Sequence, residues 1–365
     1  MTELYEYTSP QEMRQQFSQI YHREVKPMME EFEKIRVQKY KKIKTVGWVS
    51  FVIWLVVTVM SQGFLIFHAG VFISVIAAII THVKSKNFTQ LMKNSCMPRF
   101  MKAFGNLTHS IGDNAISNSN IEKSKLFLSY NIRRNDDIFV GSHKGVEFKI
   151  SETYLAHESG SGKNKSTTTL FKGVLIDFKA NKTINNTTII VPRHSRNRQM
   201  GKVGTFIFIL IFFLVFGIGF IVIGFLSKEY ELMIGGIVAG LILLAILFVK
   251  PNNVEILNEI KLEDPEFEKY YTASSSDEVE GRYLITTAFM SRFNDLKKAF
   301  GTGNICCSFY DDSLMFGIWS DKDLFEIGTI SKPLTNAKYI EQFYDQMIAI
   351  LQIIEHFKLN EKTGL

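Results

Sequence analysis

The sequence has few of the residues that mark disulfide-stabilised or metal-binding proteins. It contains three cysteines, Cys96, Cys306 and Cys307, which form neither an even set nor a Cys-x-x-Cys pair. This pattern argues against a disulfide framework and agrees with a reducing compartment. Adjacent Cys306 and Cys307 would lie on opposite faces of a strand. That placement suits small buried hydrophobic residues better than the alternative, a redox or metal site.

The sequence patterns of common enzyme classes are also missing. There is no His-Glu-x-x-His, no Gly-x-Ser-x-Gly, no complete phosphate loop and no His/Cys cluster. The glycine-rich stretch 158–166 resembles a phosphate loop, but Gly would be needed at His157 and Ser or Thr at Asn164, and strand residues follow it. We interpret it as a long connector between two strands, and we predict no catalytic residue, no cofactor and no metal.

Charged residues are missing from two long stretches. Between Lys44 and Lys84 there are 39 residues without Asp, Glu, Lys or Arg, and residues 203–226 followed by 232–249 repeat the pattern. A helix needs about 20 apolar residues to cross the hydrocarbon core of a bilayer. The sequence therefore predicts an α+β cytoplasmic domain plus four transmembrane helices in two helical hairpins, residues 45–83 and 203–249, the second inserted within the soluble domain.

Basic residues flank the predicted hairpins and predict their orientation. The turn at residues 61–63 has no charge, whereas lysine and arginine are concentrated at the opposite ends of the predicted helices. Cytoplasmic flanks carry such an excess, so we expect both termini in the cytoplasm and the basic residues at the membrane surface. These residues are Lys41, Lys42, Lys44, Lys84, Lys86, Arg193, Arg196, Arg198 and Lys202.

Glycine and histidine give further expectations for the predicted spans. Gly236 and Gly240 form a small-residue motif, which predicts close packing of the third and fourth helices, with oligomerisation as an alternative. His68 and His82 lie at the two ends of the second predicted helix. We expect them to sit near the headgroups, and proton transfer is the alternative role.

Charge is divided unequally between the two soluble parts. Residues 84–202 hold 20 Lys and Arg against 8 Asp and Glu, whereas residues 250–365 hold 12 against 19. The basic part either lies on anionic lipid headgroups or docks on the acidic part. A nucleic-acid surface is disfavoured, because no basic motif interleaved with aromatic residues accompanies the charge.

Residues 1–44 have the pattern of an amphipathic cytoplasmic helix. Ser9 and Pro10 form a good helix start, and apolar residues from Met13 to Ile35 recur mostly at steps of three and four. Pro27 should kink this helix, because proline removes one backbone hydrogen bond. We expect the protein's own soluble domain to cover the apolar stripe, and a helical partner or a second copy is the alternative.

The remaining segments predict an α+β domain in two parts, a basic part at 84–202 and an acidic part at 250–365 with a C-terminal helix. Expected strands are 145–150, 168–178, 183–191, 254–262 and 281–285, and a hairpin of 305–310 with 313–319 turning at Asp311-Asp312. Expected helices are 93–107, one starting at Asp264-Pro265, 287–300 ending at Gly301, and one near 339–354.

Two segments resemble the bacterial domain-of-unknown-function 3137 family. They are Leu262–Tyr271 and Glu280–Thr286, and further similarity occurs at Gly160–Lys165, Leu170–Gly173 and Lys322–Glu326. The resemblance covers roughly residues 130–330 and the paired N-terminal spans. It implies a multi-pass protein of the bacterial inner membrane with a cytoplasmic domain, and a LemA-type membrane protein as a candidate partner. It implies no reaction.

The sequence thus predicts an integral membrane protein that presents a cytoplasmic interaction domain at the inner leaflet, as an adaptor or scaffold. An oligomeric channel or transport component is one alternative, and an enzyme with an unrecognised site is another. Expected partners are anionic lipid headgroups, a LemA-type or other membrane protein, or a second copy of the chain; a nucleic acid is not expected.

Overall fold

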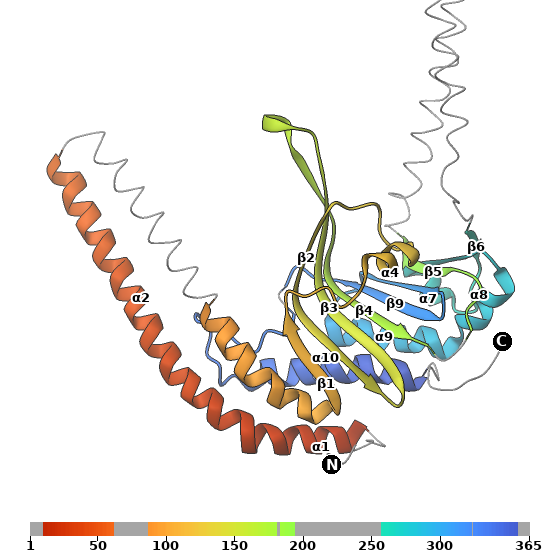
Figure 1. Ribbon diagram of the computed structural model, residues 1–365, viewed down its shortest axis with the longest axis horizontal. Coiled ribbons are helices and arrows are strands. Elements are labelled where there is room, and N and C mark those ends of the chain that lie inside the picture. The colour runs from red at the N-terminus through yellow and green to blue at the C-terminus, as the bar shows by residue number, and fades with distance from the viewer. Residues whose placement is uncertain (1–9, 62–86, 181–182, 194–256, 323, 357–365) are drawn as a thin grey trace, which may run out of the picture.

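The structure is a computed structural model of the 365-residue chain. It describes residues 10–61, 87–180, 183–193, 257–322 and 324–356. A large sheet with helices packed against it forms the centre of the molecule, and a long N-terminal helix extends away from it (Figure 1).

The described strands form one nine-stranded sheet in which every neighbouring pair is antiparallel. Its order is β1-β2-β3-β4-β9-β8-β5-β7-β6. The strands are β1 (Asn106–Ile111), β2 (Ile132–His143), β3 (Val146–Ser159), β4 (Ser166–Lys179), β5 (Thr188–Pro192), β6 (Asn258–Ile260), β7 (Tyr271–Ser275), β8 (Ile305–Tyr310) and β9 (Ser313–Trp319). Because β5 lies between β8 and β7, the segments before and after residues 194–256 belong to the same sheet.

Turn chemistry explains the hairpin that joins β8 and β9. Tyr310 pairs with Ser313, so the loop consists of Asp311 and Asp312 alone. Both aspartates have positive φ, 40° and 58°, and a two-residue turn of that kind matches the right-handed twist of the strands. The predicted hairpin and its aspartate turn are confirmed.

The helices cover the sheet and form the N-terminal arm. They are α1 (Pro10–Ile20), α2 (Lys26–Ser61), a helix at residues 87–101, α4 (Asn118–Lys123), α7 (Pro265–Tyr270), α8 (Glu278–Leu284), α9 (Thr287–Phe300) and α10 (Ala337–His356). The π-helical turn η1 (Tyr21–Val25) joins α1 to α2, and the 3-10 turn η2 (Lys102–Phe104) follows the helix at 87–101.

Side-chain caps start the helices that follow β6. Asp264 accepts hydrogen bonds from the backbone N–H groups of Glu266 and Phe267, with Pro265 at the first helical position. Thr286 caps α9 in the same way, and the left-handed Gly301 ends that helix. Both predicted helices are confirmed.

Two strand predictions on this side of the sheet are corrected. Residues 281–285 were expected to be a strand, but most of them belong to α8. The side chain of Asp277 accepts hydrogen bonds from the N–H groups of Val279 and Glu280 and so starts a helix. The strand expected at 254–262 is limited to Asn258–Ile260 among the described residues.

Aromatic side chains hold the helices against the sheet. The rings of Phe293 on α9 and Phe316 on β9 are 6.0 Å apart, and Phe343 on α10 lies 6.3 Å from Phe139 on β2. These residues belong to one large buried cluster that also takes in α1 and the helix at 87–101. A second, smaller cluster lies around α4 and includes Phe171 of β4.

The N-terminal arm packs on the domain through its apolar stripe. Phe17 lies 4.8 Å from the ring of Tyr344 on α10 and 5.7 Å from that of Phe100. The expectation that the protein's own domain covers this stripe is therefore confirmed. The kink expected at Pro27 is a π-helical turn just before it, in which the N–H of Lys26 bonds to Tyr21 O.

The predicted architecture of four transmembrane helices is wrong. Among the described residues, no helix is long and apolar enough to cross a membrane. The first expected span falls partly on α2, but the first half of that helix, up to Lys44, is charged and packs in part on the domain. Most of residues 62–83 and all of 203–249, where the other spans were expected, lie outside the described residues.

Candidate functional site

β4 extends beyond its neighbour β9, and this leaves part of its edge open. The two strands pair from Lys179 and Ser313 to Gly173 and Trp319. β4 continues for seven more residues, Ser166–Lys172, which pair with β3 on one side. No described strand pairs with their other side. We call Ser166–Lys172 the open edge, and Figure 1 shows it within a hairpin that projects beyond the sheet.

Gly173 forms the last β4–β9 pair before the strands separate. Its φ is +151°, and a Cβ placed there would lie 1.9 Å from the carbonyl oxygen of Ile318. The two backbones therefore approach more closely than any side chain would permit. Beyond this contact Ser320 N donates a last bond of 2.9 Å to Lys172 O, and the chain then turns away from β4.

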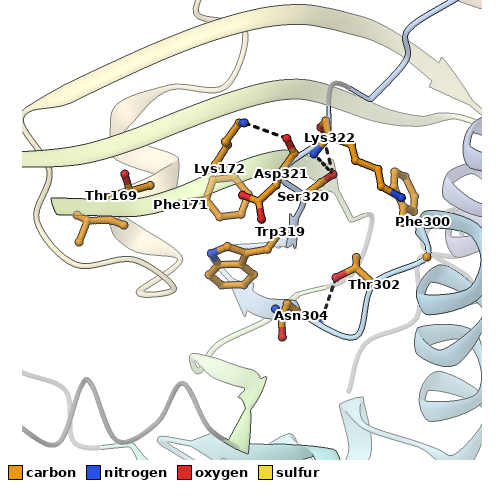
Figure 2. Close-up of a pocket in the computed structure, with 12 residues that line it drawn as sticks. Thr169, Phe171, Lys172, Phe300, Thr302, Asn304, Trp319, Ser320, Asp321 and Lys322 are labelled. Carbon is orange, nitrogen blue, oxygen red and sulfur yellow. Dashed lines mark hydrogen bonds between the residues drawn. The ribbon is translucent and has the colours of Figure 1, made fainter. Parts of the chain in front are cut away.

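A pocket of about 390 Å³ lies where the strands separate (Figure 2). Its lining comes from β4, from the end of β9 and from the turn after α9. The lining residues are Thr169, Leu170, Phe171, Lys172, Phe300, Gly301, Thr302, Asn304, Trp319, Ser320, Asp321 and Lys322. The open edge therefore leads directly into the pocket.

The pocket combines aromatic rings with amino groups. Phe171 is buried and lies 5.0 Å from the ring of Trp319, edge to face. Lys172 Nζ donates a 3.0 Å hydrogen bond to Asp321 O, which leaves two further N–H donors on the ammonium group. With Lys322 and the Asp321 carboxylate, the lining carries a net positive charge. The lining contains neither histidine nor cysteine.

Comparison with known protein families gives a match that includes the pocket. The family model described as protein of unknown function, DUF3137, matches residues 169–359. The chain belongs to the DUF3137 family. The match confirms the predicted resemblance, although it begins later and ends later than expected. No curated protein and no solved structure matches the chain. The pocket lies entirely within the DUF3137 region.

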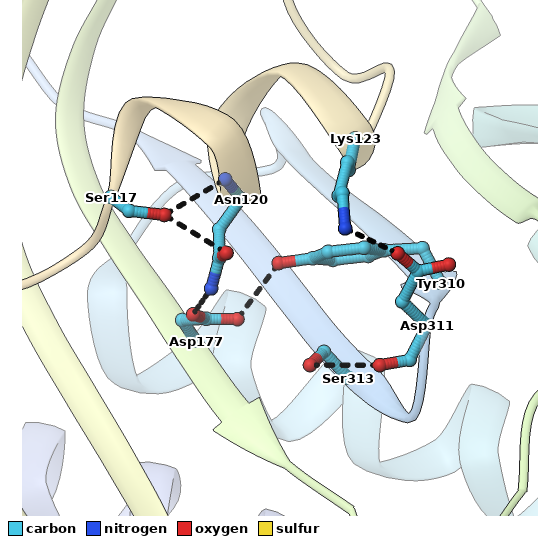
Figure 3. A network of polar contacts seen from close by, with 7 residues as sticks. All are labelled: Ser117, Asn120, Lys123, Asp177, Tyr310, Asp311 and Ser313. Carbon is cyan, nitrogen blue, oxygen red and sulfur yellow. Dashed lines mark hydrogen bonds and ion pairs between the residues drawn. The ribbon is translucent and has the colours of Figure 1, made fainter.

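A buried carboxylate on β4 has a structural role in this DUF3137 chain (Figure 3). Asp177 accepts hydrogen bonds from Asn120 Nδ2 at 2.8 Å and from the Tyr310 hydroxyl at 3.0 Å. Burial raises the pKa of Asp177, and the two hydrogen bonds oppose that rise. Burial also raises the pKa of Tyr310. The cluster ties α4 to the β8–β9 hairpin, and the ion pair of Lys123 with Asp311 supports it from the surface.

A second buried polar cluster joins the helix at 87–101 to β1 and β2. Lys93 Nζ lies 2.5 Å from Asp137 Oδ2, and His109 Nε2 lies 2.8 Å from Asp137 Oδ1. Lys93 is 3% exposed and Asp137 is fully buried. This cluster could not be predicted from the sequence, because its members are distant in the chain and no motif connects them.

The cysteines and acidic residues form no metal site in the described part of the chain. Cys96, Cys306 and Cys307 are free and buried, and for Cys306 and Cys307 this agrees with the expectation of small hydrophobic residues. Burial raises the pKa of Cys96 to about 12 and also raises the pKa of Cys306 and Cys307, so the thiolate forms are disfavoured.

The structure places only some of the predicted membrane residues. Lys41, Lys42 and Lys44 lie on an exposed part of α2. Arg193 is exposed, and its Nε donates a 3.0 Å hydrogen bond to Glu268 O. The others lie outside the described residues; they are Lys84, Lys86, Arg196, Arg198, Lys202, Gly236, Gly240, His68 and His82.

The pocket could not be predicted from the sequence. The sequence predicts the strand 168–178 but not the different lengths of β4 and β9. One signal was present, because Thr167, Thr168 and Thr169 favour a strand without supplying an apolar face, as an exposed edge requires.

Proposed function

We propose that this DUF3137 protein is an interaction module held at a membrane surface by the apolar end of α2, and that its sheet domain is presented to a partner as an adaptor. One observation carries the membrane part of the proposal. Eight large apolar side chains of α2 are exposed; they are Val46, Trp48, Val49, Phe51, Val52, Ile53, Leu55 and Val56.

These side chains form a wide apolar face. Successive residues of an α-helix are about 100° apart, so the eight positions cover about 220° of the circumference of α2, and Gly47, Ser50 and Trp54 fill the rest. Val46 is 60% exposed and Trp48 is 61% exposed. An apolar face of this width belongs against other protein or lipid, and no described element of this chain covers it.

Basic residues lie where such a helix would meet anionic headgroups. Lys41, Lys42 and Lys44 come directly before the apolar segment and are exposed. Each lysine near an anionic membrane surface contributes about 1 kcal/mol to binding. Figure 1 shows this end of α2 far from the sheet, so a membrane there leaves the sheet accessible to a partner.

The proposal requires only that the apolar end of α2 lies among the lipid acyl chains. The location we propose is the cytoplasmic face of the bacterial inner membrane, in line with the family resemblance. A LemA-type membrane protein is then a candidate partner.

Tryptophan quenching tests this proposal, because the chain has three tryptophans at informative places. Trp48 and Trp54 lie in the apolar segment of α2, and Trp319 lies in the pocket. Two single-tryptophan chains would be prepared, one with Trp54→Phe and Trp319→Phe and a matched control with Trp48→Phe and Trp54→Phe. Both would be mixed with phosphatidylglycerol vesicles that contain brominated or ordinary phosphatidylcholine.

Bromine quenches tryptophan only at close range, so the two chains should differ. We expect brominated lipid to reduce Trp48 emission at least twofold and to leave Trp319 emission unchanged. Equal emission of Trp48 in brominated and ordinary vesicles would refute the role of α2, even if other segments bind the vesicles.

A further inference from the structure

We propose that the open edge of β4 binds an extended acidic peptide of a partner by strand addition, with one acidic side chain of the peptide in the pocket beside Trp319. The inference rests on the proposed interaction function and specifies its site and ligand class. The position that the peptide would occupy is the one that β9 leaves when it turns away after its last bond to Lys172 O.

The first four residues of the open edge are accessible and lack the usual protection against pairing. Ser166, Thr167, Thr168 and Thr169 are exposed. Proteins commonly protect edge strands with proline or with charges along the edge, but these four residues contain neither. Threonine favours the extended conformation, so this edge is already shaped to accept a strand.

The pocket supplies the side-chain recognition that a bare edge lacks. In strand addition, backbone hydrogen bonds give affinity and pockets for alternate side chains give specificity. The Lys172 ammonium group stands at the junction of edge and pocket and has N–H donors beyond the one that it gives to Asp321 O. A carboxylate next to it would gain a charge-assisted hydrogen bond.

Charge favours an acidic peptide as the occupant. The net positive lining of the pocket attracts a carboxylate and repels a basic side chain.

The experiment uses the purified full chain and a phage-displayed library of random twelve-residue peptides as the probe. We expect selection of peptides without proline that carry a net negative charge. Lys172→Glu should weaken their binding at least tenfold. Lys179→Glu is the matched control, because Lys179 is an exposed lysine of the same strand where β9 is still paired. It should change binding less than twofold.

Hydrogen exchange gives a second measurement that needs no variant. A selected peptide should slow exchange of backbone amides within residues 166–172, and it should leave β1, the edge strand at one end of the sheet, unchanged. The proposal is overturned if no peptide is selected, if the two lysine variants behave alike, if protection appears elsewhere, or if the chain pairs with itself through this edge. None of these outcomes affects Trp48 quenching, so each proposal can fail separately.

Discussion

Replacing Lys93 with methionine should destabilise the protein severely, because Lys93 neutralises a carboxylate that has no access to water. Asp137 is fully buried between Lys93 and His109, at 2.5 Å and 2.8 Å. Lys93→Met keeps most of the side-chain volume but removes the charge. The Asp137 carboxylate then remains in the interior with the His109 hydrogen bond as its nearest support.

The expected loss can be estimated from the environment. Removing one partner of a buried ion pair costs about 3–5 kcal/mol, because it leaves an uncompensated charge. Asp137→Asn alone removes the carboxylate that Lys93 contacts at 2.5 Å and should cost a similar amount. The double variant Lys93→Met/Asp137→Asn removes both charges, so we expect a coupling energy of at least about 2 kcal/mol between the two sites.

Urea unfolding of the purified full chain, followed by circular dichroism, measures these free energies. A matched control comes from the exposed pair of Lys102 and Glu24, which are 2.9 Å apart. Lys102→Met removes a lysine from the surface near the same helix, and exposed pairs contribute about 0–1 kcal/mol. The reasoning is refuted if Lys93→Met costs no more than Lys102→Met, or if the effects of Lys93→Met and Asp137→Asn simply add.

Three further predictions test other parts of the fold. Burial raises the pKa of Asp177, so the folded state binds a proton more readily than the unfolded chain. The stability of the wild type relative to Asp177→Asn should therefore rise as the pH falls from neutrality toward 3.8, the ordinary pKa of this carboxyl group. Urea unfolding at several pH values measures the direction of this change. Gly173→Ala should lower stability by about 2–4 kcal/mol, because its Cβ would meet the Ile318 carbonyl, and a thermal unfolding scan that shows no change would contradict the close approach. A thiol reagent should label none of the three buried cysteines in the folded chain and all three in urea, so fast labelling of the folded chain would count against their burial.

Local signals explain which elements could be predicted from the sequence. The turn at Asp311-Asp312, the cap at Asp264 and the C-terminal Gly301 each act within a few residues, and each predicted element is present. The same kind of signal is present before residues 281–285, where a strand was predicted instead of a helix. The cap Asp277 lies four residues before the expected strand and starts α8, in which Glu280 is buried.

Glu280 shows why such a case is difficult. Its carboxylate accepts hydrogen bonds from Asn185 N and Asn186 Nδ2, which lie almost a hundred residues earlier in the chain. The buried ion pair of Lys93 with Asp137 depends on contacts of the same long-range kind. A single sequence contains no signal for these contacts, because they exist only after the sheet order is set.

The candidate site could not be predicted from the sequence for a related reason. Composition indicates that β4 is a strand but not that β9 ends earlier beside it, and the pocket exists because of that difference in length. The prediction of four transmembrane helices was wrong for a different reason. It was based on the low charge of two stretches, whereas α2 begins at Lys26 and its charged first half contacts the domain.

These contacts make the direction of α2 a property of the folded domain. Arg36 Nη1 donates a 3.0 Å hydrogen bond to Ile330 O, and Glu33 Oε2 accepts one of 2.9 Å from Leu334 N. The hydrogen bond from Arg36 also lowers the pKa of Glu33, so this pair stays ionised while it contacts the loop at residues 330–334. That loop follows residues 320–322 of the pocket in the chain. Because α2 is fixed to this loop, the angle between the apolar end of α2 and the open edge of β4 is also fixed. A membrane bound at the apolar end would therefore give the open edge the same orientation in every copy of the protein.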